Sequence, residues 1–200
     1  MGKETGCKTD KVYKGDKDMA FLQIDYKSEA LMRGVNIKVI LPSDGMAGKW
    51  EPPYKTLYLL PGYSATATEL ITYLGLRGQS ELKGIAIVLP DGENLFYQDL
   101  PDRMTFYSTY VGKELVEVTR KMLPLSTKRE DTFIGGISMG GYGALYNGFK
   151  YRDTFSKVVA FSPAADACML LAGSEAPGFS RAQFEGIFGN REAYYGSECD

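Results

Sequence analysis

Histidine is absent from the 200 residues of this chain. This side chain has an ordinary pKa near neutral pH, so it is the commonest general base and metal ligand in proteins. Cysteine is scarce: Cys7, Cys168 and Cys199 form an odd count without a C-x-x-C pair. An odd count without histidine argues against a zinc site and fits free thiols in a reducing compartment. We therefore expect no metal and no cofactor.

The net charge is small, and long apolar runs are absent from the sequence. The chain has 23 Lys and Arg against 25 Asp and Glu, a formal net charge of −2. This balance gives no electrostatic reason to expect nucleic acid or an anionic membrane surface as a partner. No apolar run approaches the roughly 20 residues that span a bilayer, and residues 1–10 lack the apolar core of a signal peptide. We expect a cytoplasmic protein that binds neither nucleic acid nor membrane.

The residues that are present suit a folded globule. Hydrophobic residues make up 44% of the chain, and its length suits one domain with a substantial core. Residues 1–18 are rich in Lys, Asp and Gly and show no periodicity, so they are predicted to be an N-terminal extension. Residues 19–200 then form the single domain.

Within this domain, short apolar segments alternate with helical patterns. Residues 20–26 and 35–41 predict an antiparallel hairpin, because apolar and polar residues alternate in the second segment. Continuous apolar runs predict buried parallel strands, and spacings of three and four residues predict helices. The strands are expected at 56–60, 85–89, 131–137 and 157–162, and the helices at 66–76, 111–122 and after residue 138. The pattern predicts an α/β fold, a mostly parallel sheet with helices on both faces.

One motif carries chemistry, Gly136-Ile-Ser138-Met-Gly140. It is a G-x-S-x-G pattern between a predicted strand and a predicted helix, the context in which a nucleophilic serine sits on a sharp turn. The turn needs small residues two positions before and after the serine. The motif could also arise by chance, since the chain has 23 glycines. We interpret Ser138 as a nucleophile.

Other loops are expected beside this serine. Residues 61–64, 91–94 and 163–166 each follow the end of a predicted parallel strand. In open α/β sheets, ligands bind outside the carboxyl ends of the strands. These loops and Ser138 should therefore share one edge of the sheet.

The chain resembles the esterase D-like branch of the α/β-hydrolases, in particular the tributyrin esterases, over roughly residues 19–190. The segments that carry this resemblance are residues 57–63, residues 89–92 and the run S-M-G-G-Y-G-A-L at 138–145. The resemblance implies Ser138 as the nucleophile and the backbone N–H of Met139 as one oxyanion donor. The second donor would come from the loop at Gly62 and Tyr63.

The resemblance also implies that Phe96 and Tyr97 flank the substrate cleft; simple packing of a long loop is an equally good interpretation. Two departures stand out. Pro61-Gly62 stands where the family usually has His-Gly. In the family, the catalytic acid and histidine arrive on two further strand–loop units. We expect both beyond residue 200, with the last strands of the fold missing. The sheet edge and apolar surface left exposed would then invite aggregation or pairing with another chain, as in a homo-oligomer.

The leading hypothesis is a serine carboxylesterase that hydrolyses short-chain acyl esters of small molecules through an acyl-enzyme on Ser138. A second hypothesis, motivated by the absent histidine, is a catalytically incompetent α/β-hydrolase-like binding protein. A third keeps the enzyme class and changes the substrate to a thioester or a carbohydrate ester.

Overall fold

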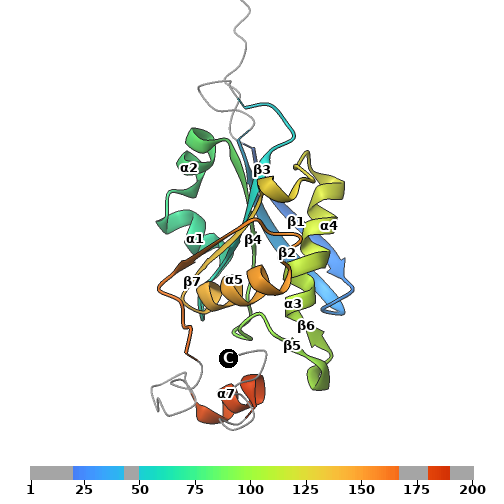
Figure 1. Cartoon of the computed structure of the whole chain (residues 1–200), viewed down its shortest axis with the longest axis vertical. Helices are drawn as coiled ribbons and strands as arrows, with labels where there is room; N and C mark the ends of the chain where they lie inside the picture. The colour runs from blue at the N-terminus through green and yellow to red at the C-terminus, as the bar shows by residue number, and fades with distance from the viewer. Residues whose placement is uncertain (1–19, 43–49, 167–179, 190–200) are drawn as a thin grey trace, which may run out of the picture.

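A computed structural model describes residues 20–42, 50–166 and 180–189. The predicted extension at 1–18, Cys7, Cys168 and Cys199 lie outside these ranges. A six-stranded sheet in the order β1-β2-β4-β3-β7-β8 forms the centre of the fold (Figure 1). Its strands are β1 (Ala20–Ser28), β2 (Arg33–Leu41), β3 (Lys55–Leu60), β4 (Ile85–Pro90), β7 (Thr132–Ile137) and β8 (Lys157–Phe161).

The sheet combines the two expected pairing modes. β1 and β2 form an antiparallel hairpin, and β2 pairs antiparallel with β4. β4, β3, β7 and β8 are parallel to one another. The α/β architecture, its mostly parallel sheet and its N-terminal hairpin are therefore confirmed.

Helices cover both faces of this sheet (Figure 1). α1 (Ala67–Tyr73) and α2 (Leu76–Lys83) lie on one face. On the other face lie α5 (Met139–Lys150) and a continuous helical segment made of α3 (Tyr107–Thr109), the π-helical turn η2 (Tyr110–Glu114) and α4 (Leu115–Met122). α7 (Arg181–Phe188) lies near the carboxyl edge of the sheet.

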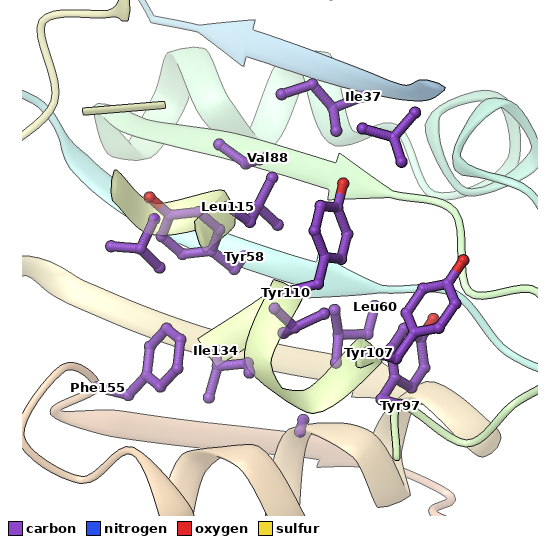
Figure 2. Close-up of a cluster of buried hydrophobic side chains, with 14 of the residues drawn as sticks. Ile37, Tyr58, Leu60, Val88, Tyr97, Tyr107, Tyr110, Leu115, Ile134 and Phe155 are labelled. Atoms are coloured by element: carbon purple, nitrogen blue, oxygen red, sulfur yellow. The ribbon is translucent and has the colours of Figure 1, made fainter. Parts of the chain in front are cut away.

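Each face has its own apolar core. The smaller core packs α1 and α2 against residues such as Ile40, Leu59 and Leu89. The larger core lies under α4 and α5 and is rich in tyrosine. Figure 2 shows Tyr97 and Tyr107 at one end of this core and Tyr110 nearer its middle. The Tyr107 ring makes edge-to-face contacts with Tyr97 and Tyr110, at centroid distances of 6.2 and 5.9 Å.

Two sequence predictions were wrong. The strand at 157–162 was expected to be buried, but β8 is an edge strand among the described residues, and Val159 and Phe161 are 43% and 57% exposed. The single helix predicted at 66–76 breaks at Gly75, which adopts a left-handed φ of 59°. Thr66 caps the first of the two helices through a capping box with Glu69.

The aromatic loop after β4 contains more structure than the sequence indicated. β5 (Asp99–Leu100) and β6 (Thr105–Phe106) pair as a short antiparallel hairpin around the 3₁₀ turn η1 (Pro101–Arg103). A further 3₁₀ turn, η3 (Arg129–Asp131), leads into β7. Two-residue strands carry too little alternation to be recognised from sequence.

Candidate active site

Ser138 occupies a sharp turn between β7 and α5. Its backbone has φ 55° and ψ −116°, outside the regions that non-glycine residues normally adopt. Holding a residue there costs on the order of 1–3 kcal/mol, so the surrounding structure must enforce the turn. The side chain is exposed. Ser138 is thus presented to solvent at the carboxyl edge of the sheet, as the motif predicted.

Close backbone packing enforces this turn. A Cβ atom at Gly136 would collide with the backbone of Gly140, and a Cβ atom at Gly140 would collide with the carbonyl oxygens of Leu60 and Pro61. Glycine is therefore required at both positions of the motif. The same contacts press the start of α5 against the end of β3.

The loop after β3 lies beside the serine. A Cβ atom built on Gly62 would lie 3.5 Å from Cβ of Ser138 and 3.2 Å from the carbonyl oxygen of Ile137. Tyr63 follows Gly62 in the same loop. Met139 is the first residue of α5, where backbone N–H groups and the positive end of the helix dipole point out of the helix. Ser138 therefore lies next to both backbone segments that the resemblance names as oxyanion donors, and their donation stays a prediction.

The end of β8 holds the serine backbone from the other side. The N–H of Ser138 donates to the carbonyl oxygen of Phe161 at 2.9 Å, and the N–H of Ala164 donates to the carbonyl oxygen of Ser138 at 3.1 Å. The loops after β3, β7 and β8 thus meet at one edge, as predicted.

The loop after β4 holds the loop after β3 and the first residue of α1 through three hydrogen bonds. The hydroxyl of Tyr97 donates to the carbonyl oxygen of Pro61 at 2.8 Å. The carboxylate of Asp91 accepts from the N–H of Ala67 at 2.9 Å, and the side-chain oxygen of Asn94 accepts from the N–H of Ser64 at 2.6 Å. The position of the candidate oxyanion loop is therefore set by residues about 30 positions away in the chain. Sequence reasoning had assigned no role to Asp91 or Asn94 beyond a shared edge.

Both aromatic residues expected at the substrate cleft are buried. Tyr97 is completely buried, its backbone carbonyl accepts from Asn147, and burial raises its pKa well above the ordinary value. Its ring packs closely against Gly143. Tyr97 therefore stays a neutral hydroxyl donor at every ordinary pH. The structure shows packing for this residue, and contact with substrate stays a prediction.

Phe96 lies in a cluster of aromatic rings. Its ring contacts those of Tyr142, Phe184 and Phe188 at centroid distances of 5.7, 5.8 and 5.0 Å, and that of Tyr63 at 6.3 Å. Phe184 and Phe188 belong to α7. Phe96 thus connects α7 to the candidate oxyanion loop from inside the protein. Only tertiary structure could reveal this, because α7 is about 90 residues further along the chain.

A serine on a strand–turn–helix elbow, beside a loop after a neighbouring parallel strand, is typical of the α/β-hydrolase class. The sheet order and the antiparallel β2 agree with it. A sequence model of the family described as "Putative esterase" matches residues 28–194. The chain belongs to this esterase family.

Individual relatives agree. An acetyl esterase of Caldicellulosiruptor saccharolyticus is 40% identical over 151 residues, which cover 73% of this chain and 57% of the relative. An S-formylglutathione hydrolase of Paracoccus denitrificans is 28% identical over 192 residues, 84% of this chain and 63% of the relative. The solved structure of the fluorophosphonate-binding serine hydrolase F of Staphylococcus aureus superposes with a TM-score of 0.77 at 30% identity, over 91% of this chain and 70% of the other.

The chain therefore spans about six tenths of the length of these two sequence relatives. Within the ranges that the structure describes, no group of three or more Asp, Glu and Cys side chains is placed to hold a metal ion. In the same ranges, no helix combines the length and apolar character needed to cross a bilayer.

Proposed function

We propose that this chain carries the nucleophile half of a serine carboxylesterase that acts on short-chain acyl esters of small molecules. Membership of the esterase family supports the reaction class. The observation that carries the assignment to Ser138 is its strained, exposed turn beside Gly62. Acetyl esterase activity in a relative that is 40% identical supports a short acyl group.

In the proposed reaction, Oγ of Ser138 attacks the ester carbonyl carbon and the carbonyl oxygen becomes an oxyanion. The backbone N–H groups of Met139 and Tyr63 donate to this oxyanion, and Gly62 leaves room for the substrate to approach. Removing one such donor typically costs about 10²–10³ in kcat. Collapse of the intermediate releases the alcohol and leaves an acyl group on Ser138, which water then removes.

The proton of the Ser138 hydroxyl needs an acceptor. Histidine suits this task because its pKa lies near the working pH, but the 200 residues contain none. We propose that the base is a histidine outside this sequence, paired with a carboxylate. A triad enzyme that lacks its base still accelerates the reaction by on the order of 10³–10⁴ over the reaction in water. The oxyanion hole and substrate binding supply this residual acceleration.

Two measurements test this proposal. The first is turnover of p-nitrophenyl butyrate by this chain and by a longer form that includes a histidine, each compared with its Ser138→Ala variant. The second is covalent labelling by a fluorophosphonate, located by mass spectrometry. We expect fast labelling of Ser138 and turnover in the longer form. Equal turnover by its Ser138→Ala variant would refute the role of Ser138.

The alternative is a binding protein that keeps the fold without the chemistry, and the absent histidine is the observation in its favour. It predicts that Ser138 reacts with a fluorophosphonate no faster than an exposed serine outside the site, such as Ser180. A cytoplasmic location remains our expectation, which cell fractionation tests.

A further inference from the structure

Backbone strain is concentrated at the edge of the sheet where Ser138 lies. Within the described residues, nine non-glycine residues have a positive φ, and seven of them follow the carboxyl ends of β3, β4, β7 and β8. The seven are Ser64, Glu93, Asn94, Phe96, Tyr97, Ser138 and Ser162. A residue with a Cβ atom is unfavourable in this conformation and keeps it only where surrounding groups enforce it. The loops at this edge therefore hold one another in place.

Most of the strained residues belong to one segment, residues 93–97 after β4, which we call the left-handed segment. Four of its five residues have φ between 48° and 57°. Three of its side chains contact the loop after β3, each at a different residue. The pairs are Asn94 with Ser64, Phe96 with Tyr63, and Tyr97 with Pro61. The strained segment thus contacts the candidate oxyanion loop along its length.

The pair of Asn94 and Ser64 joins two left-handed residues. Their φ angles are 57° and 60°. The side-chain oxygen of Asn94 accepts from the backbone N–H of Ser64 at 2.6 Å, a short distance for such a bond. Asparagine adopts the left-handed conformation more readily than most residues, whereas serine needs outside support for it. The bond from Asn94 supplies that support to Ser64.

This bond also determines which amides of the loop can serve an oxyanion. Each backbone N–H is a single donor. The N–H of Ser64 is committed to Asn94, and that of Ala65 donates to the carbonyl oxygen of Gly62 at 3.2 Å. A donor to Ser138 from this loop is therefore the N–H of Gly62 or of Tyr63. Because neighbouring peptide groups share the backbone of Tyr63, fixing the Ser64 amide also restricts how these two can turn.

We propose that Asn94 is a positioning residue of the oxyanion hole. By holding the Ser64 amide, it fixes the Gly62 and Tyr63 peptide groups in the orientation that donates to an oxyanion on Ser138. Donors that are already oriented need no reorganisation when charge develops, which is why they accelerate a reaction. The inference rests on the proposed function, because the oxyanion forms only if Ser138 attacks a carbonyl carbon.

Three variants separate the hydrogen bond from the backbone conformation. Asn94→Gly removes the acceptor, but glycine adopts φ 57° without strain, so the fold should remain. Asn94→Asp keeps an acceptor oxygen at the same place. Met104→Gly is the matched control. Met104 also has a left-handed φ, of 50°, but its side chain is 64% exposed and it lies in the turn between β5 and β6.

Hydrogen exchange of the Ser64 amide, measured by NMR on this chain, reports the bond without catalysis. We expect exchange at least tenfold faster in Asn94→Gly than in the wild type. Exchange should be no faster in Asn94→Asp or in Met104→Gly. Thermal unfolding checks that each variant folds, and Asn94→Ala gives a second test of the missing acceptor.

Turnover of p-nitrophenyl butyrate by the longer form that includes a histidine reports the positioning role. Asn94→Gly should lower kcat by about ten- to a hundredfold, because a donor that is out of place no longer stabilises the transition state. KM should change less than twofold, since substrate binding before the reaction does not need the oriented amide. Met104→Gly should keep both constants.

Three results would overturn the inference. They are equal exchange of the Ser64 amide in the wild type and Asn94→Gly, faster exchange with an unchanged kcat, and an equal loss of kcat in Met104→Gly. Failure of the proposed function is distinct, because it appears as equal turnover by the longer form and its Ser138→Ala variant. Failure of the positioning role alone leaves that difference intact.

Discussion

The hydroxyl of Tyr97 donates a 2.8 Å hydrogen bond to the carbonyl oxygen of Pro61, the residue that leads into the candidate oxyanion loop. Both atoms are buried, so neither can exchange its partner for bulk water. Tyr97, which the resemblance places at the substrate cleft, thus holds the backbone beside Ser138.

Tyr97→Phe should destabilise the protein by about 1–3 kcal/mol, because it leaves a buried carbonyl oxygen without its donor. Urea unfolding measures this loss. The amides of residues 62–66 should also exchange hydrogen faster, since the loop loses a support. Tyr73→Phe is the matched control, because Tyr73 is 79% exposed. Unchanged stability and exchange in Tyr97→Phe would show that the bond has no such role.

Gly140→Ala should destabilise the fold by about 2 kcal/mol or more, because its Cβ would meet the carbonyl oxygens of Leu60 and Pro61. Gly78→Ala provides the opposite case. Gly78 lies inside α2, and its added Cβ would meet nothing within 4 Å. It should stabilise by roughly 0.5–1 kcal/mol through helix propensity. Chemical denaturation of both variants checks the pair, and equal effects would contradict the packing described.

Ser138→Gly should be more stable than Ser138→Ala by roughly 1 kcal/mol or more. Both variants remove the hydroxyl, but only glycine adopts φ 55° and ψ −116° without strain. Thermal and urea unfolding measure the stability of both variants. Because neither variant has the hydroxyl, the difference between them reports the backbone strain and not the loss of the serine side chain. Equal stabilities would mean that the turn stores no strain.

Stability should fall as pH rises from about 10 to 12. Burial raises the pKa of Tyr58 to about 12, and its hydroxyl bonds to Thr119 at 2.8 Å. An unfolded tyrosine loses its proton near pH 10, so the unfolded state binds fewer protons in this window and alkaline pH favours it. Each such group contributes up to about 1.4 kcal/mol per pH unit. Urea unfolding at pH 8, 10 and 11 should show a shallower decline for Tyr58→Phe, and an identical decline would contradict the cause.

Val159→Lys should reduce self-association. β8 is the outer strand of the described sheet, and Val159 is 43% exposed on it. An exposed apolar edge invites strand pairing, and an edge lysine opposes it. Light scattering after gel filtration measures the mass. Leu82→Lys, at a 70% exposed position on α2, is the control. A monomeric wild type would remove the basis for a homo-oligomer.

The parts of the fold that sequence predicted are those with a local physical signal. The G-x-S-x-G turn was predictable because its two required glycines, Gly136 and Gly140, lie only four positions apart in the sequence. The requirement is therefore visible as a local motif. β3 and β4 were predictable because buried parallel strands are continuously apolar, and β7 because its apolar residues lead directly into the serine motif. The break at Gly75 was missed because a glycine inside a helical pattern is tolerated in many helices.

The sequence alone determined the α/β class, the hairpin at the start of the sheet, the candidate nucleophile Ser138 and the shared edge to which its loops belong. Tertiary structure decided which residues support that site. Only the folded structure shows the contacts that Asn94, Phe96 and Tyr97 make with the loop after β3. Each of these residues contacts a partner 30 or more positions away in the sequence. Such contacts depend on how strands are ordered across the sheet, and no spacing along the chain encodes that order.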